Sequence, residues 1–488
     1  MIRVWTDGER AGVLDRAKAR GSVFAYAPDA AADRAVSVTM PVRLESWNTD
    51  RGLAPIFEMN LPEGALRERL QRMFAKASDR FDDLDLLEVV GASQIGRTRY
   101  SPLDRDLEEK VPTQSIQEIL RTRHSNELFE YLLQRFAQHS GLSGVQPKVM
   151  IRSADANTSD KKARRSPTIQ SATHIVKFWE REEYPELAAN EFYCLTAARA
   201  LGLPVPHFEL SDDGGALVVE RFDLADGAYL GFEDFCVLSA LGAAQKYEGS
   251  YETRVFKRLR DYLDPIELPN AFEQLFKLFV LNCALRNGDA HLKNFGIVYE
   301  NVNGASRLAP VYDIVNTTAY IPPDLMALSL EGSKRWPDRP KLIRLGQLRC
   351  GLSTPRIEAI LEATADALAD TAPALARHFK NSEFEIGERI RAAWESGIRD
   401  TLGLSRGLAL VPAQPRARTR RAGQPARSDA LLLEHLRAHG GMISGTQKSI
   451  ADAIGVPPTT LSSAIRRLVD RGLLFNGRRS LQLLEREV

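Results

Sequence analysis

The chain has 488 residues, of which 44% are hydrophobic and 26% are charged, the composition of a folded protein with several domains. Its net charge of +1 and its lack of a long apolar run argue against a membrane protein and against nucleic-acid binding over the whole surface. The charge is uneven, however: residues 406–488 carry a net charge of +8, and the first 405 residues carry −7. The four cysteines form no CxxC pair and the N-terminus lacks a signal-peptide pattern, so we expect a cytoplasmic protein with free thiols.

Residues 1 to about 105 form a first α/β unit. Residues 36–40 alternate between apolar and polar like a strand, and residues 64–77 have the pattern of an amphipathic helix. The helix follows the turn Leu61-Pro62-Glu63-Gly64. No group of residues in this unit indicates catalysis, so the sequence favours a structural or docking domain.

The second unit, residues 106–405, contains a glycine-rich turn. A helix predicted over 116–138 leads to the run His139-Ser-Gly-Leu-Ser-Gly-Val-Gln-Pro-Lys148, and an apolar strand follows at 149–151. Two glycines that flank a serine ahead of a strand suit a turn whose backbone N–H groups bind phosphate. An ordinary glycine turn fits the same residues, and so short a motif favours that interpretation when taken alone.

Charged residues then occupy positions that matter in kinases. Residues 173–178 alternate as a strand that carries Lys177, where a kinase has the lysine that contacts the α- and β-phosphates, although a lysine there can simply reach solvent. A predicted helix at 186–200 carries Glu191, which can pair with Lys177 or play a solvated or capping role. The strand at 216–223 ends in charge, as a kinase chain does where it crosses between lobes and binds adenine, and as ordinary strands also do.

The most polar stretch of the second unit is Leu285–Asn294. Three helices are predicted before it, at 232–241, 251–263 and 272–284. A cluster of Asn, Asp, His and Lys between apolar elements is costly to bury unless each polar group has a partner. Asp289 and Asn294 stand five residues apart, which is the spacing of the Asp and Asn in the catalytic loop of protein kinases.

A second acidic position lies further along the chain. Tyr312 and Asp313 end a short predicted strand, and Asp313 comes 24 residues after Asp289. A kinase needs an acidic residue one β-hairpin beyond its catalytic loop to bind Mg²⁺. Because Mg²⁺ takes carboxylate and amide oxygens together with substrate phosphates, Asp313 and Asn294 are the predicted metal ligands.

The third unit, residues 428–488, follows a Pro- and Arg-rich linker at 406–427. Its pattern predicts helices at 429–438, 446–454 and 459–471, with a tight turn at Gly455 and a hairpin at Asn476-Gly477. This order indicates a winged helix-turn-helix. Small helical domains also bind proteins, but the basic linker favours DNA. The candidate DNA-binding residues are Thr459, Thr460, Ser462, Ser463, Arg466 and Arg467 on the third helix and Arg478 and Arg479 on the wing.

Five motifs stand in a specific order: Ser143–Lys148, Thr173–Lys177, Val219–Asp223, Asp289–Asn294 and Tyr312-Asp313. Together they resemble the HipA family of serine/threonine kinases, the toxins of toxin–antitoxin modules, and Met59–Gly64 with Val90–Gly96 resemble the N-terminal domain of that family. The resemblance covers roughly residues 1–405. It implies an α+β, protein-kinase-like bilobal fold, with an N-terminal domain at 1–105, a nucleotide lobe at about 106–225 and a helical lobe at about 226–405. The small winged-helix unit would be an addition to that fold.

The resemblance implies a role for each matched residue. Asp289 would be the general base or would orient the attacking hydroxyl, and Asn294 and Asp313 would bind Mg²⁺. The run from Ser143 to Lys148 would form the phosphate-binding loop, and Glu220 to Phe222 would hold the adenine. The residues expected to bind ATP are Ser143, Gly144, Val145, Gln146, Lys148, Lys177, Glu220, Arg221, Phe222, His291, Lys293, Asn294 and Tyr312.

Two features depart from the family. Members commonly carry a serine two residues before the position of Ser143, and its autophosphorylation ejects the loop and switches the kinase off; here that residue is Gly141. Either Ser143 (or Ser140) takes over this role or the switch is missing. A phosphate on the loop would compete with the ATP phosphates by like-charge repulsion, so Ser143 is the candidate autophosphorylation site. The second departure is the C-terminal unit.

The sequence thus predicts an ATP- and Mg²⁺-dependent serine/threonine protein kinase that acts as a toxin. By resemblance, its substrate would be a translation component such as an aminoacyl-tRNA synthetase. Its other partners would be a small helix-turn-helix antitoxin and operator DNA, without a membrane, and a homodimer stays open. The alternative is a DNA-binding transcription regulator whose kinase-like core senses nucleotide and is catalytically weak. Gly141 and the C-terminal unit favour that alternative, whereas the intact catalytic positions oppose it.

Overall fold

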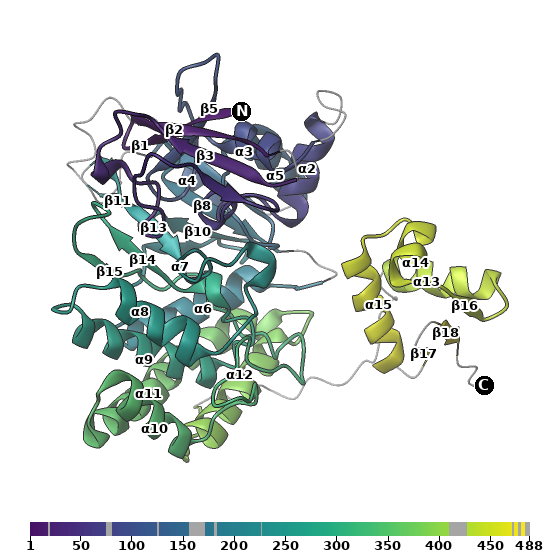
Figure 1. Cartoon of the computed structure of the whole chain (residues 1–488). Coiled ribbons are helices and arrows are strands. Elements are labelled where there is room, and N and C mark those ends of the chain that lie inside the picture. The colour runs from purple at the N-terminus through teal and green to yellow at the C-terminus, as the bar shows by residue number, and fades with distance from the viewer. Residues whose placement is uncertain are drawn as a thin grey trace. The chain divides into compact units, whose positions relative to one another are not determined.

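The computed structural model describes residues 1–17, 20–74, 81–123, 126–155, 171–179, 183–225, 227–408, 427–470, 473–476 and 480–483. The chain divides into two compact units, at 1–412 and 413–488 (Figure 1). Among the helices of the described ranges, none is both long and apolar enough to span a membrane.

The first unit begins with an antiparallel sheet of five strands in the order β4-β3-β2-β1-β5. Alternate residues on its strands are apolar and buried, such as Ile2 and Val4 on β1 and Phe24 on β3, so one face belongs to a hydrophobic core together with the helices that follow. The elements are β1 (Ile2–Thr6), β2 (Glu9–Arg16), β3 (Ser22–Tyr26), β4 (Trp47–Thr49), β5 (Thr98–Pro102), α1 (Pro55–Glu58), α2 (Gly64–Phe74) and α3 (Asp83–Val90).

Two local predictions for the first part of the chain were wrong. Residues 36–40 form a tight turn rather than a strand, because Glu233 accepts hydrogen bonds from Ser37 Oγ at 2.7 Å and from Val38 N at 2.8 Å. The single helix predicted over 116–138 is instead two helices, since Thr122 adopts an extended conformation. These helices are α4 (Ile116–Arg121) and α5 (Asn126–Phe136).

A second five-stranded sheet, in the order β6-β7-β8-β10-β9, carries the two candidate lysines of the phosphate site. Strands β7 and β8 are antiparallel and place Lys148 directly opposite Lys177. Leu217 and Val219 on β10 belong to the core that helix α6 (Leu187–Ala200) helps to build, whereas Val218 belongs to the core of the N-terminal sheet. The strands are β6 (Thr113–Gln114), β7 (Lys148–Ser153), β8 (His174–Phe178), β9 (Phe208–Leu210) and β10 (Ala216–Glu220).

The rest of this unit is mostly helical and lies in the teal-to-green half of Figure 1. The helix predicted at 232–241 starts instead as strand β13, because β13 pairs with β14 directly after the catalytic-loop candidate. Its strands are β11 (Leu224–Ala225), β12 (Ala228–Tyr229), β13 (Gly231–Asp234), β14 (Gly296–Tyr299) and β15 (Ser306–Leu308). Its helices are α7 (Phe235–Leu238), α8 (Lys257–Tyr262), α9 (Leu268–Leu285), α10 (Arg339–Cys350), α11 (Thr354–His378) and α12 (Ile386–Ser396), with π-helical turns at Tyr251–Phe256 and Gly397–Thr401.

The C-terminal unit has its own hydrophobic core, which includes Leu432, Leu436 and Leu461. The three helices predicted there are confirmed, and Gly455, with φ of +70°, ends the second of them. Its sheet has the order β16-β18-β17 and is antiparallel. The elements are α13 (Arg427–Ala438), β16 (Met442–Ser444), α14 (Gln447–Ile454), α15 (Pro458–Asp470), β17 (Leu474–Asn476) and β18 (Ser480–Leu483). Residues 409–426 of the predicted linker lie outside the described residues.

Candidate active site

The loop that carries Asp289 begins where the buried helix α9 ends. Arg286 closes this helix in a left-handed conformation, with φ of +61°, and its guanidinium donates to Thr401 Oγ1 at 2.8 Å. Asn287 Nδ2 donates to Asn282 Oδ1 at 2.7 Å, and Asn287 Oδ1 accepts from Asp289 N at 3.1 Å. Arg286 and Asn287 thus obtain the partners that their burial requires, and Asn287 holds Asp289 at the end of α9.

Asp289 combines partial exposure with a strong hydrogen bond. Its side chain is 48% exposed, and Tyr247 Oη donates to its Oδ1 at 2.6 Å. The burial of the surrounding site raises the pKa of Asp289 to about 6, although the hydrogen bond from Tyr247 opposes this rise. Asp289 is therefore mostly ionised at pH 7, and its pKa lies near the range that suits a general base.

Lys177 joins the nucleotide sheet to two acidic side chains. Its Nζ lies 2.6 Å from Glu191 Oε1 on α6 and 2.8 Å from Asp313 Oδ1, so the ion pair expected between Lys177 and Glu191 is present. Burial alone would raise the pKa of Asp313, but Lys177 and Lys148 outweigh it and hold that pKa far below its ordinary value. Asp313 is consequently an anion at every physiological pH.

The two predicted metal ligands lie in contact. Asn294 Nδ2 donates to Asp313 Oδ2 at 3.1 Å, and Asp313 adopts a left-handed backbone with φ of +55°. Among the described residues no group of three or more His, Cys, Asp or Glu could hold a metal ion. This does not exclude Mg²⁺, because that ion takes one or two protein oxygens and completes its shell with phosphate and water. A carboxylate and an amide side by side, next to two lysines for the phosphates, fit a Mg²⁺–nucleotide.

In the predicted phosphate loop, Gly144 lies against the side chain of Lys148. Gly144 has φ of +109°, a conformation that favours glycine, and the Lys148 ammonium lies where a side chain at this position would be. Gln146 Nε2 donates to Phe178 O at 3.0 Å, which ties the loop to strand β8, while Val145 is 62% exposed. Ser143 is half-buried.

The predicted adenine-binding segment is only partly arranged as expected. The side chain of Arg221 is buried and points away from the lysines: its guanidinium pairs with Asp223 at 2.6 Å and donates to Gln94 O at 2.7 Å. Phe222 instead stacks on Tyr312, with ring centroids 5.6 Å apart and planes 29° apart. The backbone N–H groups of Glu220 and Arg221 donate to His207 O at 2.8 Å and to Thr173 O at 2.9 Å. The segment therefore has an aromatic pair that could contact a base, but neither these backbone donors nor the Arg221 side chain.

His291 and Lys293 have different surroundings. His291 is buried, burial lowers its pKa to about 3, and its Nδ1 has no hydrogen-bond partner among the described residues. Lys293 points toward the N-terminal sheet domain, where its Nζ donates to Met59 O at 3.0 Å and to Glu63 Oε1 at 3.4 Å. This position disfavours the predicted direct contact of Lys293 with phosphate. In the short 3₁₀ turn Leu292–Asn294, neighbouring side chains point in different directions, so Asn294 reaches Asp313 while Lys293 does not.

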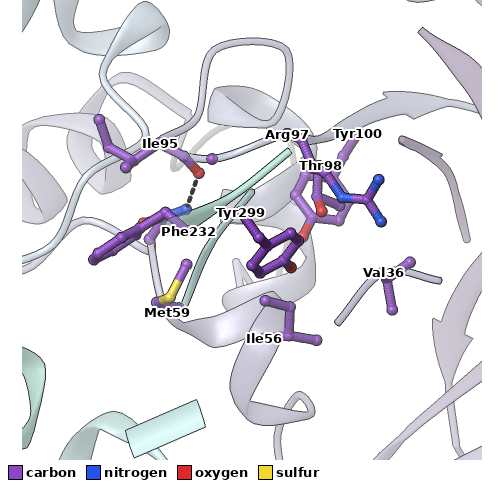
Figure 2. A pocket seen from close by; sticks show the side chains of 11 residues that line it. Val36, Ile56, Met59, Ile95, Arg97, Thr98, Tyr100, Phe232 and Tyr299 are labelled. Atoms are coloured by element: carbon purple, nitrogen blue, oxygen red, sulfur yellow. Dashed lines mark hydrogen bonds between the residues drawn. The ribbon is translucent and has the colours of Figure 1, made fainter. Parts of the chain in front are cut away.

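A small pocket lies between the N-terminal sheet and strands β13 and β14, beside Met59, whose carbonyl binds Lys293 (Figure 2). Asn60 Nδ2 donates across it to Ile95 O at 2.8 Å, which is the dashed line in Figure 2. No candidate residue for ATP or Mg²⁺ lines this pocket, so it is not the nucleotide site. It is lined by Val36, Ile56, Met59, Asn60, Ile95, Gly96, Arg97, Thr98, Tyr100, Phe232 and Tyr299.

Two family models match the chain: the HipA N-terminal domain over residues 2–101 and the HipA-like C-terminal domain over residues 140–372. These two regions of the chain are thus similar to the two domains of HipA, and they are called its HipA domains below. The "Putative kinase Y4mE" of Sinorhizobium fredii is 28% identical over 344 residues, which cover 67% of this chain and 79% of that protein. The "Serine/threonine-protein kinase toxin HipA" of Shewanella oneidensis is 29% identical over 198 residues, which cover 37% of this chain and 43% of that protein.

A solved structure shares the fold of the HipA domains. A chain of the complex of the Shewanella oneidensis toxin–antitoxin system HipA, HipB and its operator DNA aligns with a TM-score of 0.58 at 18% sequence identity. The alignment covers 83% of this chain and 98% of that chain. The predicted HipA resemblance is therefore confirmed at the level of the family domains and of the fold.

In the C-terminal unit, the residues of the third helix that were predicted to contact DNA differ in their surroundings. Arg467 pairs with Asp429 on α13 at 2.7 Å and donates to Ser428 Oγ at 2.9 Å, so it stabilises this unit. Ser462 and Arg466 are exposed, four residues apart on one face, and Thr460 and Ser463 are half-buried. Arg478, Arg479 and the side chain of Thr459 lie outside the described residues.

The motifs missed two residues that contact the HipA site. Tyr247 hydrogen-bonds to Asp289, and Glu63 lies 3.4 Å from Lys293 Nζ and 3.7 Å from Lys246 Nζ. Glu63 belongs to a turn that the sequence had singled out for its resemblance to the HipA N-terminal domain, so its motif was visible while its contact was not. Tyr247 lies in no motif, and no local signal indicates its role.

Proposed function

We propose that the chain is an ATP- and Mg²⁺-dependent serine/threonine protein kinase that acts as a HipA-type toxin. The observation that carries the proposal is the meeting of Lys177, Asp313 and Asn294, which come from different parts of the chain. A lysine, a carboxylate and an amide in contact are the residues that phosphoryl transfer needs for positioning and for charge stabilisation. The relatives named as kinases support the same activity.

Each residue has a separate task in this proposal. Lys177 and Lys148 neutralise the nucleotide phosphates, and Glu191 fixes the direction of Lys177. Asn294 and Asp313 would hold Mg²⁺, which when bound neutralises the charge on the β- and γ-phosphates. Asp289 accepts the hydrogen bond of the substrate hydroxyl and orients it toward the γ-phosphate. It takes the hydroxyl proton as the new O–P bond forms, while the bond from the γ-phosphorus to the β–γ bridging oxygen breaks and ADP leaves. Neutral His291 closes the inner side of the site.

The substrate and the regulation follow from the family resemblance. We propose as substrate a translation component such as an aminoacyl-tRNA synthetase, and as partner a small helix-turn-helix antitoxin, since the structural relative was solved with HipB and operator DNA. Ser143 is the proposed autophosphorylation site, because it belongs to the loop that holds Lys148 beside Gly144. A phosphate there would repel the ATP phosphates.

The test compares Asp289→Asn and Asp313→Asn with the parent chain in phosphate transfer from radiolabelled ATP to the proteins of a cell lysate. Both variants are expected to lose at least about 100-fold in rate. Asp289→Asn removes the carboxylate proposed to take the substrate proton, and Asp313→Asn removes the carboxylate proposed to bind Mg²⁺. Phosphoserine is identified by mass spectrometry, and growth inhibition in cells is expected to disappear with the transfer.

Asp106→Asn is the matched control, since Asp106 is 96% exposed and, among the residues that the structure describes, pairs only with Arg3 at 3.4 Å. It should leave transfer and growth inhibition unchanged, and circular dichroism should show all three variants folded. Undiminished transfer by both site variants would overturn the kinase mechanism. Nucleotide binding without any transfer by the parent chain would favour the alternative, a transcription regulator with a nucleotide-sensing core.

A second proposal concerns the C-terminal unit, which we assign to DNA binding as a winged helix. Exposed Arg466 and Ser462 on helix α15 and the net charge of +8 over residues 406–488 support this assignment. Retardation of the chain's own promoter DNA in a gel tests it.

A further inference from the structure

Residues 242–248 connect the N-terminal HipA domain to the catalytic loop. The backbone carbonyl of Lys246 accepts a hydrogen bond from Leu292 N at 3.1 Å, so the segment is attached to the loop through the main chain. The next residue, Tyr247, donates its hydroxyl to Asp289 Oδ1 at 2.6 Å. The segment therefore contacts, through Tyr247, the Asp289 side chain that would receive the substrate proton.

Glu63 of the N-terminal domain binds this segment and the catalytic loop at the same time. Its Oε1 lies 3.4 Å from Lys293 Nζ, and its Oε2 lies 3.7 Å from Lys246 Nζ. Both ammonium groups are largely buried, with side chains 7% and 15% exposed. Burial alone would raise the pKa of Glu63, but Lys293, Lys246 and Lys148 outweigh it and hold that pKa below its ordinary value, so the bridge is ionised at neutral pH.

The same turn also touches the phosphate loop. Gly64 has φ of +51°, and a side chain there would lie 2.8 Å from the backbone oxygen of Val145. The turn formed by Glu63 and Gly64 thus contacts the phosphate loop, the catalytic loop and the segment that carries Tyr247. A domain without catalytic residues of its own is in contact with three parts of the site.

Tyr247 restricts the orientation of the Asp289 carboxylate. One carboxylate oxygen accepts from Tyr247, and the other lies 4.0 Å from His291 Nε2, beyond hydrogen-bond distance. The Tyr247 ring meets the His291 ring edge-on, with centroids 5.1 Å apart, which fixes the phenol in turn. A hydrogen bond between a hydroxyl and a carboxylate is short and strong, so it prevents the carboxylate from rotating and leaves Oδ2 for an incoming hydroxyl.

We propose that Tyr247 is a positioning residue for Asp289 and that Glu63 of the N-terminal HipA domain positions Tyr247 through Lys246 and Lys293. The inference rests on the proposed kinase function and extends it, since it gives the N-terminal domain a part in the chemistry of the site. Neither residue transfers a proton or contacts ATP in this proposal. Each acts by fixing the residue next to it.

The test is a double-mutant cycle of Tyr247→Phe and Glu63→Gln in the full chain, with kcat and KM measured for both substrates. Tyr247→Phe is expected to lower kcat on the order of tenfold, because a hydrogen bond to a charged group is worth about one power of ten in rate or more. KM for ATP should stay within about twofold, since Tyr247 contacts the catalytic loop and not the lysines of the phosphate site. Glu63→Gln should also lower kcat, but by less than about twofold when Phe is already at position 247, because both residues act through one path.

The pH dependence of the rate distinguishes positioning from a general loss of structure. The titratable and charged groups that face Asp289 are Tyr247, Lys246, His291, Asp313 and Asp324. Among them the Tyr247 hydrogen bond stabilises the ionised form of Asp289, so its removal should move the acidic limb of kcat/KM to higher pH. A variant that is merely destabilised would have a lower kcat/KM at every pH, and the acidic limb of its pH profile would stay at the same pH.

Tyr131→Phe is the matched control, since Tyr131 is a 46% exposed tyrosine on α5 whose hydroxyl accepts a hydrogen bond from Arg135, its one hydrogen-bond partner in the described ranges. It should match the parent chain in kcat and in pH profile. The inference is overturned if Tyr247→Phe leaves kcat unchanged or raises it, or if the effects of the two substitutions simply multiply. A parent chain that transfers no phosphate would overturn the kinase function itself, and Asp289→Asn measured alongside separates that result from a failure of the inference alone.

Discussion

Lys177 is one cation shared by two carboxylates, and the two acids respond in opposite directions. Burial raises the pKa of Glu191, and its Oε2 has no hydrogen-bond partner in the described part of the chain. For Asp313, which is one-third exposed, burial also acts to raise the pKa, but Lys177 and Lys148 outweigh it, so the pKa of Asp313 falls. The asymmetry keeps the negative charge on Asp313, where a divalent cation would be bound, and leaves Glu191 to orient Lys177.

The pKa of Asp289 predicts the pH dependence of phosphate transfer. Burial raises it from 3.8 to about 6, so the carboxylate form that accepts the substrate proton is present above pH 6 and is lost as the pH falls through this value. We expect kcat/KM for the protein substrate to fall about tenfold per pH unit below pH 6 and to be level from pH 7 to 8. Initial rates between pH 5 and 8 measure this, with circular dichroism at pH 5 to show that the chain stays folded. A level profile down to pH 5 would contradict it.

The sequence predicted those site residues whose spacing along the chain sets their place in space. Asp289 and Asn294 share one loop, and a single hairpin leads from them to Asp313, so their contact with the site follows from local geometry. Tyr247 lies 42 residues before Asp289, and Glu63 lies 230 residues before Lys293, so only the folded chain brings them together. For Lys293 the motif suggested a role that the fold does not favour: a phosphate contact was predicted, whereas its side chain reaches Glu63.

At the scale of elements, close packing between helix α9 and the π-helical turn Gly397–Thr401 supports the catalytic loop. A methyl group at Gly397 would overlap the backbone oxygen of Ala284, near the end of α9. Arg286, which directly precedes the loop residues, donates to Thr401 Oγ1 in this turn. The turn therefore fixes the position of the end of α9 through these two contacts.

Gly397→Ala is expected to destabilise the chain, because a backbone atom cannot move aside as a flexible side chain can. The expected loss is roughly 1–3 kcal/mol, the range for overpacking in a core, and thermal unfolding should show it as a fall of a few degrees in Tm. Gly407→Ala is the matched control, since Gly407 is exposed and has nothing within 4 Å of an added Cβ. Equal Tm values for the two variants would show that α9 can shift without loss.

Helices were easier to predict than strands whose partners are distant. Most residues of the run 272–284 are apolar, and this pattern predicted the buried helix α9. Residues 231–234, Gly-Phe-Glu-Asp, include two acidic residues, yet they are buried and pair with β14, which lies more than 60 residues further along the chain. So short a segment does not show from its own sequence whether it continues the following helix or forms a buried strand, and the distant partner decides between them.

At the scale of the whole molecule, the net positive charge lies in the C-terminal part of the chain, with +8 over residues 406–488 against −7 over the first 405. With Arg467 paired to Asp429, Arg466 is the arginine on the exposed face of α15. We expect Arg466→Ala to weaken binding to promoter DNA and to reduce the slope of log K against log salt by about one, since one phosphate contact is lost. Gel shifts at several salt concentrations measure this. Arg437→Ala, which removes the same charge from an exposed position on α13, should change the slope less. Equal effects of the two substitutions would show that the DNA does not bind preferentially at α15.

The hydrophobic core shared by the two sheets of the first unit has a consequence for gene architecture. Val149, Val176 and Val218 of the nucleotide sheet pack in one core with Ile2 and Phe24 of the N-terminal sheet. A gene that lost the first hundred codons would encode a nucleotide lobe with an apolar face open to water, which promotes aggregation rather than an independent enzyme. We therefore expect the two parts of the first unit to fold only together, whereas removal of the C-terminal unit, which has a core of its own, would leave the shared core covered.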